Sequence, residues 1–119
     1  MAAIDVEQLV TDIKGAVNAI INKDIAAVKG FSDRQLRAIV VQAKLVAEGI
    51  ATGEITEETR EFFLDGIENM TDNFLATLKG LFQVTVEKLW NAVVGVVWGA
   101  INSAIGVTTG LVLPVPTKE

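Results

Sequence analysis

The sequence predicts an all-α fold in which two short capped helices fold against one long third helix, followed by an extended tail that contains proline. Three observations support this prediction. Apolar residues recur every three or four positions rather than every second position, which is the period of a helix. A side chain suited to capping precedes each apolar stripe. Both prolines, Pro114 and Pro116, lie near the C-terminus, so no proline interrupts a helix before them.

The first helix is expected to begin after Asp5. The Asp5 carboxylate can cap the first turn, and Gln8 stands three residues later, as in a capping box. Gly30 is the expected stop, because glycine readily adopts the left-handed conformation that ends many helices. Between these ends, the apolar stripe consists of Val6, Val10, Ile13, Val17 and Ile20.

The second helix has the same kind of start, with Ser32 as the cap and Gln35 completing the capping box. Gly53 is its expected left-handed stop. The apolar stripe consists of Leu36, Val40, Ala43, Ala47 and Ile50. Val41 and Leu45 fall outside this stripe, so the helix is apolar on more than one side.

The third helix is expected to begin after Thr56, with Glu57 and Glu58 in the first turn, where the helix dipole favours negative charge. The pattern predicts no break until about Gly106. A continuous helix of about 50 residues would be about 75 Å long. Its apolar face consists of Phe63, Ile67, Met70, Phe74, Leu78, Phe82, Val86, Leu89, Val93, Val97, Ala100 and Ala104.

The last part of this helix carries no charge, because the next charged residue after Lys88 is Lys118. Two helices of half its length can cover only its first half, so we expect the apolar half to be covered by other copies of the chain or by lipid. The chain then divides into a charged amphipathic region over 1–88, an oligomerisation or membrane segment over 89–110, and a tail over 111–119.

A compact monomeric bundle is the alternative. It requires the long helix to bend back at Gly80 or in the Gly95–Gly99 region, since glycine weakens a helix by roughly 1 kcal/mol relative to alanine. In that arrangement the chain's own helices would cover the apolar part.

Small and amide side chains form a narrow strip along the uncharged segment. The strip consists of Asn91, Gly95, Gly99, Asn102 and Gly106, which are spaced by four, four, three and four residues. Gly95 to Gly99 is a GxxxG match. Such a strip allows two helix backbones to approach closely and gives each buried amide a partner across the contact. The predicted oligomer or membrane interface consists of Leu89, Asn91, Val93, Gly95, Val97, Trp98, Gly99, Asn102 and Gly106.

The composition offers little catalytic chemistry. Histidine and cysteine are absent, which removes the usual general base, the thiolate nucleophile and the softer metal ligands. We therefore expect no enzyme activity, no catalytic residues, no cofactor and no metal site. The phenylalanines Phe62, Phe63, Phe74 and Phe82 are expected in the core. One helix face is acidic, and it consists of Glu57, Glu61, Asp65, Glu68 and Asp72.

The acidic face has two interpretations. The first is a solvated surface, and the second is a contact with Arg34, Arg37 and Lys44 of the second helix, in the same copy or in a neighbouring one. Nucleic-acid binding is not expected, because the net charge is −5 and no basic patch exists. The N-terminal residues lack the basic and apolar regions of a cleavable signal peptide.

The expected function is that of a non-enzymatic structural subunit in a homo-oligomeric helical assembly. The assembly would be a ring, tube or barrel, as in a virus particle or an injection or secretion apparatus. The alternative is a membrane-embedded or membrane-inserting oligomeric anchor, channel or pore-forming protein. The expected partners are other copies of the chain and, in the alternative, a lipid bilayer, so the expected location is an assembly or a membrane.

Overall fold

The computed structural model describes residues 4–31, 33–82 and 84–116, and in these ranges it contains α-helices, one short 3₁₀ helix and no strand. The all-α prediction is therefore confirmed. The elements in chain order are α1 (Val6–Ile21), η1 (Ile25–Ala27), α2 (Arg34–Thr52), α3 (Glu57–Phe82) and α4 (Val86–Thr109).

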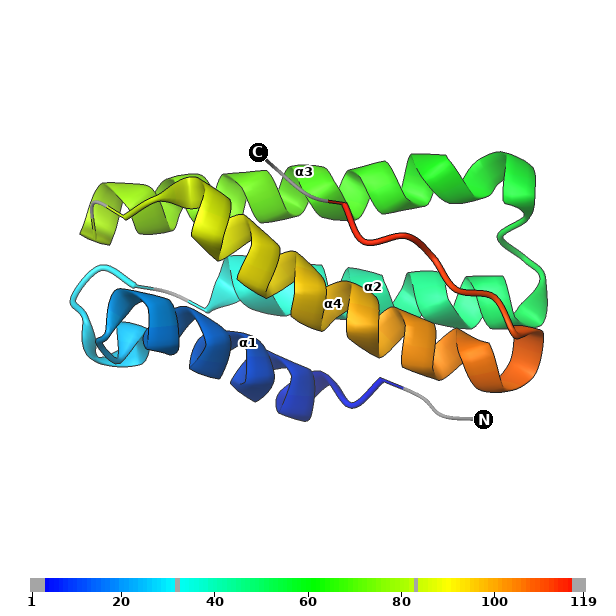
Figure 1. The fold of residues 1–119 in the computed structure, drawn as a ribbon, viewed down its shortest axis with the longest axis horizontal. Coiled ribbons are helices and arrows are strands. Elements are labelled where there is room, and N and C mark those ends of the chain that lie inside the picture. Colours follow the sequence, from blue (N-terminus) through cyan, green and yellow to red (C-terminus); the bar gives the residue numbers. More distant parts are fainter. Residues whose placement is uncertain (1–3, 32, 83, 117–119) are drawn as a thin grey trace.

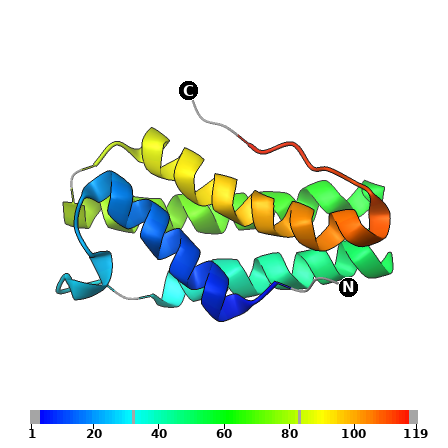
Figure 2. The same cartoon turned by 60° about the horizontal axis from the view of Figure 1, so that its bottom comes forward.

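The four α-helices form an elongated bundle with principal extents of 41 × 27 × 19 Å. Figure 1 shows α4 crossing in front of α2, with α3 along one side and α1 along the other. Figure 2 gives the same arrangement turned so that the lower side of Figure 1 comes forward, with α1 at the front of the bundle. α4, the most apolar of the four helices, packs against α1, α2 and α3, and α2 also packs against each of the other three.

The start of α1 follows the predicted capping rule, but its end does not. The backbone N–H of Gln8 donates to the Asp5 carboxylate at 3.1 Å, as expected. The predicted stop at Gly30 is wrong, because α1 ends at Ile21 and Asn22 adopts the left-handed conformation with φ 63°. The Asn18 side chain then accepts a hydrogen bond from Ile25 N–H at 2.9 Å, which fixes the turn into η1. Asparagine tolerates this conformation better than other residues with a Cβ.

The end of α2 is as predicted, since Gly53 adopts the left-handed conformation with φ 84°. Its predicted cap, Ser32, lies outside the described residues, and the next residue, Asp33, directly precedes the helix. The Arg37 guanidinium donates to the carboxylates of Asp33 at 3.0 Å and Glu7 at 2.6 Å. These bonds hold the pKa values of both carboxyls below their usual range. They tie the start of α1 to the start of α2.

The predicted continuous third helix is wrong, because α3 ends at Phe82 and α4 begins at Val86. Val84, Thr85 and Val86 are consecutive β-branched residues, which lose side-chain freedom in a helix. Thr85 has an extended backbone with φ −74° and ψ 117°, as expected for a residue that precedes a helix. The chain therefore reverses between the two helices. The bend lies in neither of the glycine positions that the sequence suggested.

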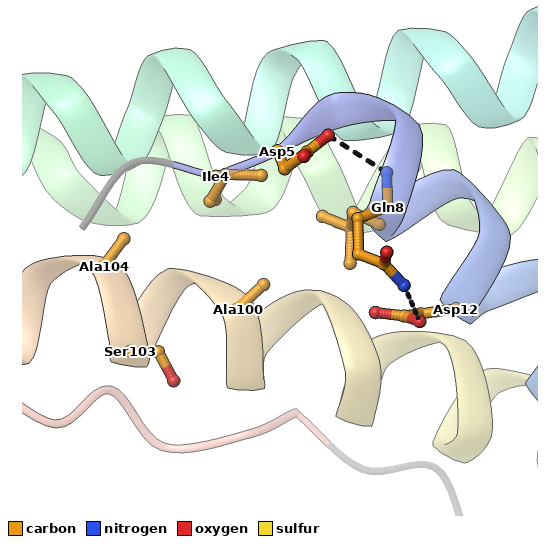
Figure 3. Close-up of a pocket in the computed structure, with 8 residues that line it drawn as sticks. Ile4, Asp5, Gln8, Asp12, Ala100, Ser103 and Ala104 are labelled. Carbon is orange, nitrogen blue, oxygen red and sulfur yellow. Dashed lines mark hydrogen bonds between the residues drawn. The ribbon is translucent and has the colours of Figure 1, made fainter.

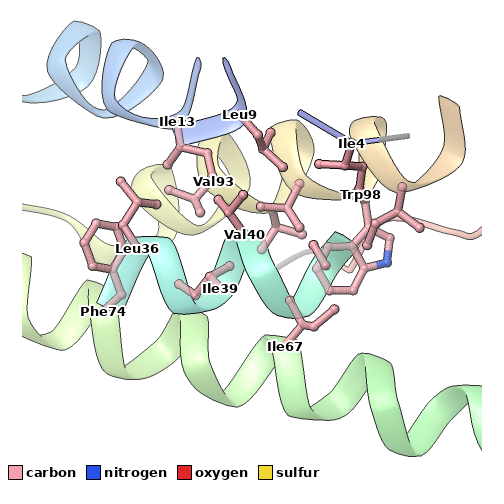
Figure 4. Close-up of a cluster of buried hydrophobic side chains, with 14 of the residues drawn as sticks. Ile4, Leu9, Ile13, Leu36, Ile39, Val40, Ile67, Phe74, Val93 and Trp98 are labelled. Carbon is pink, nitrogen blue, oxygen red and sulfur yellow. The ribbon is translucent and has the colours of Figure 1, made fainter. Parts of the chain in front are cut away.

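The reversal gives the apolar segment a cover within its own chain. Leu89, Trp90, Val93 and Val97 of α4 are all buried in the bundle. Figure 4 shows the side chains of Ile13, Leu36, Phe74 and Val93, one from each helix, pointing into the same core. The expectation that this segment needs lipid or another chain for cover is therefore wrong for its core side, and the compact bundle is the arrangement observed.

The segment after α4 is neither helix nor strand over 110–116, and it runs back along α4 (Figure 1). Gly110 ends the helix in the left-handed conformation with φ 70°, and its N–H bonds to the Gly106 carbonyl. Leu113 is buried, with 4% of its surface exposed. The tail is thus part of the folded unit: it runs between α3 and α4 (Figure 1), and it lines a hollow together with both helices.

Candidate self-association surface

The helical period divides the nine predicted interface residues between two faces of α4. Four of the nine are buried within the chain and belong to the core that α4 shares with the other helices. Asn91, Gly95 and Gly99 are exposed, while Asn102 and Gly106 are partly buried. We call these five residues the α4 strip. The buried residues are Leu89, Val93, Val97 and Trp98.

The glycines of the α4 strip face open space. A Cβ atom built on Gly95, Gly99 or Gly106 would meet nothing within 4 Å outside the local helix backbone. Gly49 in α2 is different, because a Cβ there would lie 2.6 Å from the Ile55 side chain. A glycine inside a helix costs roughly 0.5–1 kcal/mol relative to alanine. Packing within the chain explains Gly49, but it does not explain the glycines of the α4 strip.

A shallow hollow borders the α4 strip on the side of α1 (Figure 3). Its volume is about 210 Å³, and the short side chains of Ala100 and Ala104 leave this space open. At its polar rim, the backbone N–H of Gln8 donates to Asp5, and the Gln8 side-chain amide donates to Asp12 at 2.9 Å. The rim carboxylates therefore already have hydrogen-bond partners, and the hollow offers mainly apolar surface.

The tail borders the α4 strip on the other side. The Asn102 amide nitrogen donates to the Leu113 carbonyl at 3.0 Å, and the Leu113 N–H donates to the Asn102 amide oxygen at 2.7 Å. The sequence suggested that the amides of the strip find partners across a contact between chains. For Asn102, the structure supplies that partner from the tail of the same chain.

The predicted acidic face lies on α3, separated from the α4 strip by the tail (Figure 1). Burial and the neighbouring carboxylates of Asp65, Glu61 and Asp72 raise the pKa of Glu68. Among the described residues, no group of three or more histidine, cysteine or acidic side chains is placed to hold a metal ion. Of the basic residues suggested as its partners, Arg37 instead binds Glu7 and Asp33. For Arg34 and Lys44, a contact with the acidic face stays a prediction.

An exposed apolar region lies around α2 and the start of α3, and the sequence predicted its α2 part alone. Phe62 was expected in the core, but 76% of its surface is exposed, and it lines a second hollow of about 430 Å³ between these helices. Phe74 is buried as expected, and Phe63 is partly buried. Adjacent residues point about 100° apart on a helix, so Phe62 and Phe63 cannot both face the core fully. Leu45 is also exposed, as its position outside the α2 stripe indicated.

One helix among the described residues, α4 over Val86–Gly106, is long and apolar enough to cross a membrane. Half of its most apolar window is buried inside the bundle. No protein-family model, curated protein or solved structure matches the chain. Its function is therefore argued from the geometry of α4 and its surroundings.

Proposed function

We propose that the protein is a non-enzymatic structural subunit that associates with copies of itself through the α4 strip, within a homo-oligomeric helical assembly. The observation that carries this proposal is the set of in-register glycines at Gly95, Gly99 and Gly106, which face open space. They weaken α4 as a helix and relieve no steric conflict in the folded chain. A second helix packed on this strip would use the space, because glycine allows two backbones to approach closely.

The charge distribution supports the same surface. The chain carries a net charge of −5, so two copies repel each other through most of their surfaces. The α4 strip has no charged side chain from Asn91 to Gly106. A contact made there brings the copies together where no like charges face each other directly. The hollow beside α1 adds apolar surface at the edge, where a side chain of the partner can insert.

The size of the strip predicts a weak pairwise contact. A stable interface usually buries about 800 Å² on each partner, which is more than one narrow strip on a helix of about 36 Å supplies. We therefore expect association to be concentration-dependent and to be strengthened when several copies assemble.

The test is the mass of the particle in solution, measured by light scattering over a range of concentrations. The wild-type chain should rise to at least twice its 12.7 kDa mass. Gly95→Leu with Gly99→Leu should remain monomeric, because the bulky side chains block close approach. The control is Gly15→Leu, since Gly15 is another exposed helical glycine with open space around it. A wild-type chain that stays monomeric, or a double variant that still associates, contradicts the proposal.

Membrane insertion of α4 is the second candidate, and the apolar length of Val86–Gly106 favours it. In this function, α4 leaves the bundle and crosses a bilayer as part of an oligomeric anchor or pore. The two candidates predict opposite effects of Gly95→Leu with Gly99→Leu. Leucine blocks the helix contact in water, but it favours transfer into lipid. Flotation with lipid vesicles should increase in the variant if insertion is the function, and should be absent for both chains if it is not.

A further inference from the structure

The groove between α3 and α4 already holds a peptide, which is the chain's own tail. Leu64 and Glu68 of α3, Trp98 of α4 and the tail residues 111–116 together line a hollow of about 320 Å³ that the tail leaves open. Most of its polar contacts go to the peptide backbone. Asn102 pairs with both the N–H and the carbonyl of Leu113, and the Trp90 indole N–H donates to the Pro116 carbonyl at 3.2 Å.

Only one tail side chain between Leu111 and Pro116 is buried deeply. Leu113 has 4% of its surface exposed, whereas Val112 has 76% and Val115 has 43% exposed. The two prolines have no N–H group, so they leave fewer backbone donors to satisfy in the groove. The site thus recognises an extended segment by its backbone and by one leucine, much as a sheet edge recognises an added strand.

All of these contacts lie beyond Gly110, the residue that ends α4. Gly110 has φ 70°, and the next residue, Leu111, donates its N–H to the Thr109 hydroxyl at 3.0 Å. A glycine can change its backbone angles at little cost, so the tail can swing away while α4 remains folded. Each contact in the groove could equally be made by the same segment of another molecule, because none depends on the chain being continuous through Gly110.

We propose that the α3–α4 groove accepts the tail of a second copy in place of the chain's own tail, so that neighbouring copies are linked by exchanged tails. The second copy is the occupant because every copy carries the segment whose backbone and leucine the groove fits. A tail tethered to its own groove has an effective concentration in the millimolar range. Exchange between copies therefore competes with binding of the chain's own tail when neighbouring copies reach a similar local concentration. The contact is separate from the α4 strip pairing, apart from the shared Asn102.

The first experiment titrates a fluorescent peptide of residues 110–119 with two full-length chains. The wild-type chain should bind weakly, because its own tail competes. The chain with Leu113→Ala should bind the peptide at least tenfold more tightly, because its own tail has lost its anchor. A peptide with Leu113→Ala should not bind, while the matched peptide with Val112→Ala should bind normally, because Val112 points outward. Absence of binding to both chains, or equal binding of the two variant peptides, overturns the proposal.

The second experiment joins two complementary chains. The acceptor ends at Gly110 and has a groove without a tail, and the donor is full-length with Asn102→Ala and has a tail without a working groove. Both carry Gly95→Leu and Gly99→Leu, so that failure of the α4 strip contact cannot be mistaken for failure of tail exchange. The mixture should form a one-to-one complex by light scattering, while each chain alone stays monomeric.

Circular dichroism of the acceptor is measured first. A folded acceptor that forms no complex with the donor overturns the proposal. If the shortened chain does not fold, the peptide titration with full-length chains decides the question.

Discussion

α3 and α4 follow each other in the chain and share one uninterrupted apolar stripe, yet they occupy the bundle differently. α3 packs against α2 and α4 and presents its acidic face outward. α4 packs against all three other helices and has no charged residue after Lys88. The comparison teaches that a periodic stripe reports which side of a helix is buried. It does not report whether the helix continues, because that depends on a few residues between Phe82 and Val86.

The largest effect is expected from removing a buried aromatic residue of α4. Trp98→Ala should lower the free energy of unfolding by about 3–5 kcal/mol, because it leaves a cavity among the helices. Phe62→Ala in α3 should change it by less than about 0.5 kcal/mol, because Phe62 is exposed. Urea unfolding followed by circular dichroism measures both. Similar losses for the two variants would contradict the placement of α4 in the core.

A smaller effect, of opposite sign, is expected on the outer side of α4. Gly95→Ala and Gly99→Ala should each stabilise the monomer by about 0.5–1 kcal/mol, because alanine favours helix and meets no other atoms here. Gly49→Ala should give no such gain, because the added methyl group overlaps Ile55. Thermal unfolding at low protein concentration measures the monomer alone. If both α4 variants are destabilised, the surface of α4 is covered even in the single chain.

The smallest effect is expected on the acidic face of α3. Burial and neighbouring carboxylates raise the pKa of Glu68, so its charge opposes folding above this pKa, and the opposition disappears as the pH falls below the value in the unfolded chain. Glu68→Gln should therefore raise stability at pH 7 by less than about 1 kcal/mol, and the gain should vanish near pH 4.

The matched control for this pH dependence is Glu58→Gln, at the start of α3. Its charge interacts favourably with the helix dipole, so its removal should lower stability by a few tenths of a kcal/mol. Unfolding midpoints at pH 4 and pH 7 measure both variants. An equal gain for Glu68→Gln at both pH values would show that charge is not the cause.

Local rules predicted much of the helical structure. Asp5 and Gly53 behave as the sequence indicated, because capping depends on residues within one turn. The separation of the α4 strip from the buried stripe could also be predicted from the sequence, since both follow the helical period. The end of α1 at Asn22 was missed because Gly30 carries the stronger conventional signal.

The chain reversal and the role of Asn102 could not be derived in the same way. The reversal depends on Val84, Thr85 and Val86, each tolerable in a helix on its own, and on the gain from packing α4 against three distant helices. The pairing of Asn102 with Leu113 joins residues that no helical period relates. Long-range packing decides both, and a single sequence contains no direct measure of it.

The central position of α4 also sets the order in which the molecule can be completed during synthesis. α1, α2 and α3 leave the ribosome before α4, which packs against all three of them, and the tail that lines a hollow with α3 and α4 follows. Until α4 emerges, the inner faces of α1 and α2 have incomplete cover, and these contacts join residues far apart in the chain. The complete core can therefore form only after α4 has been synthesised.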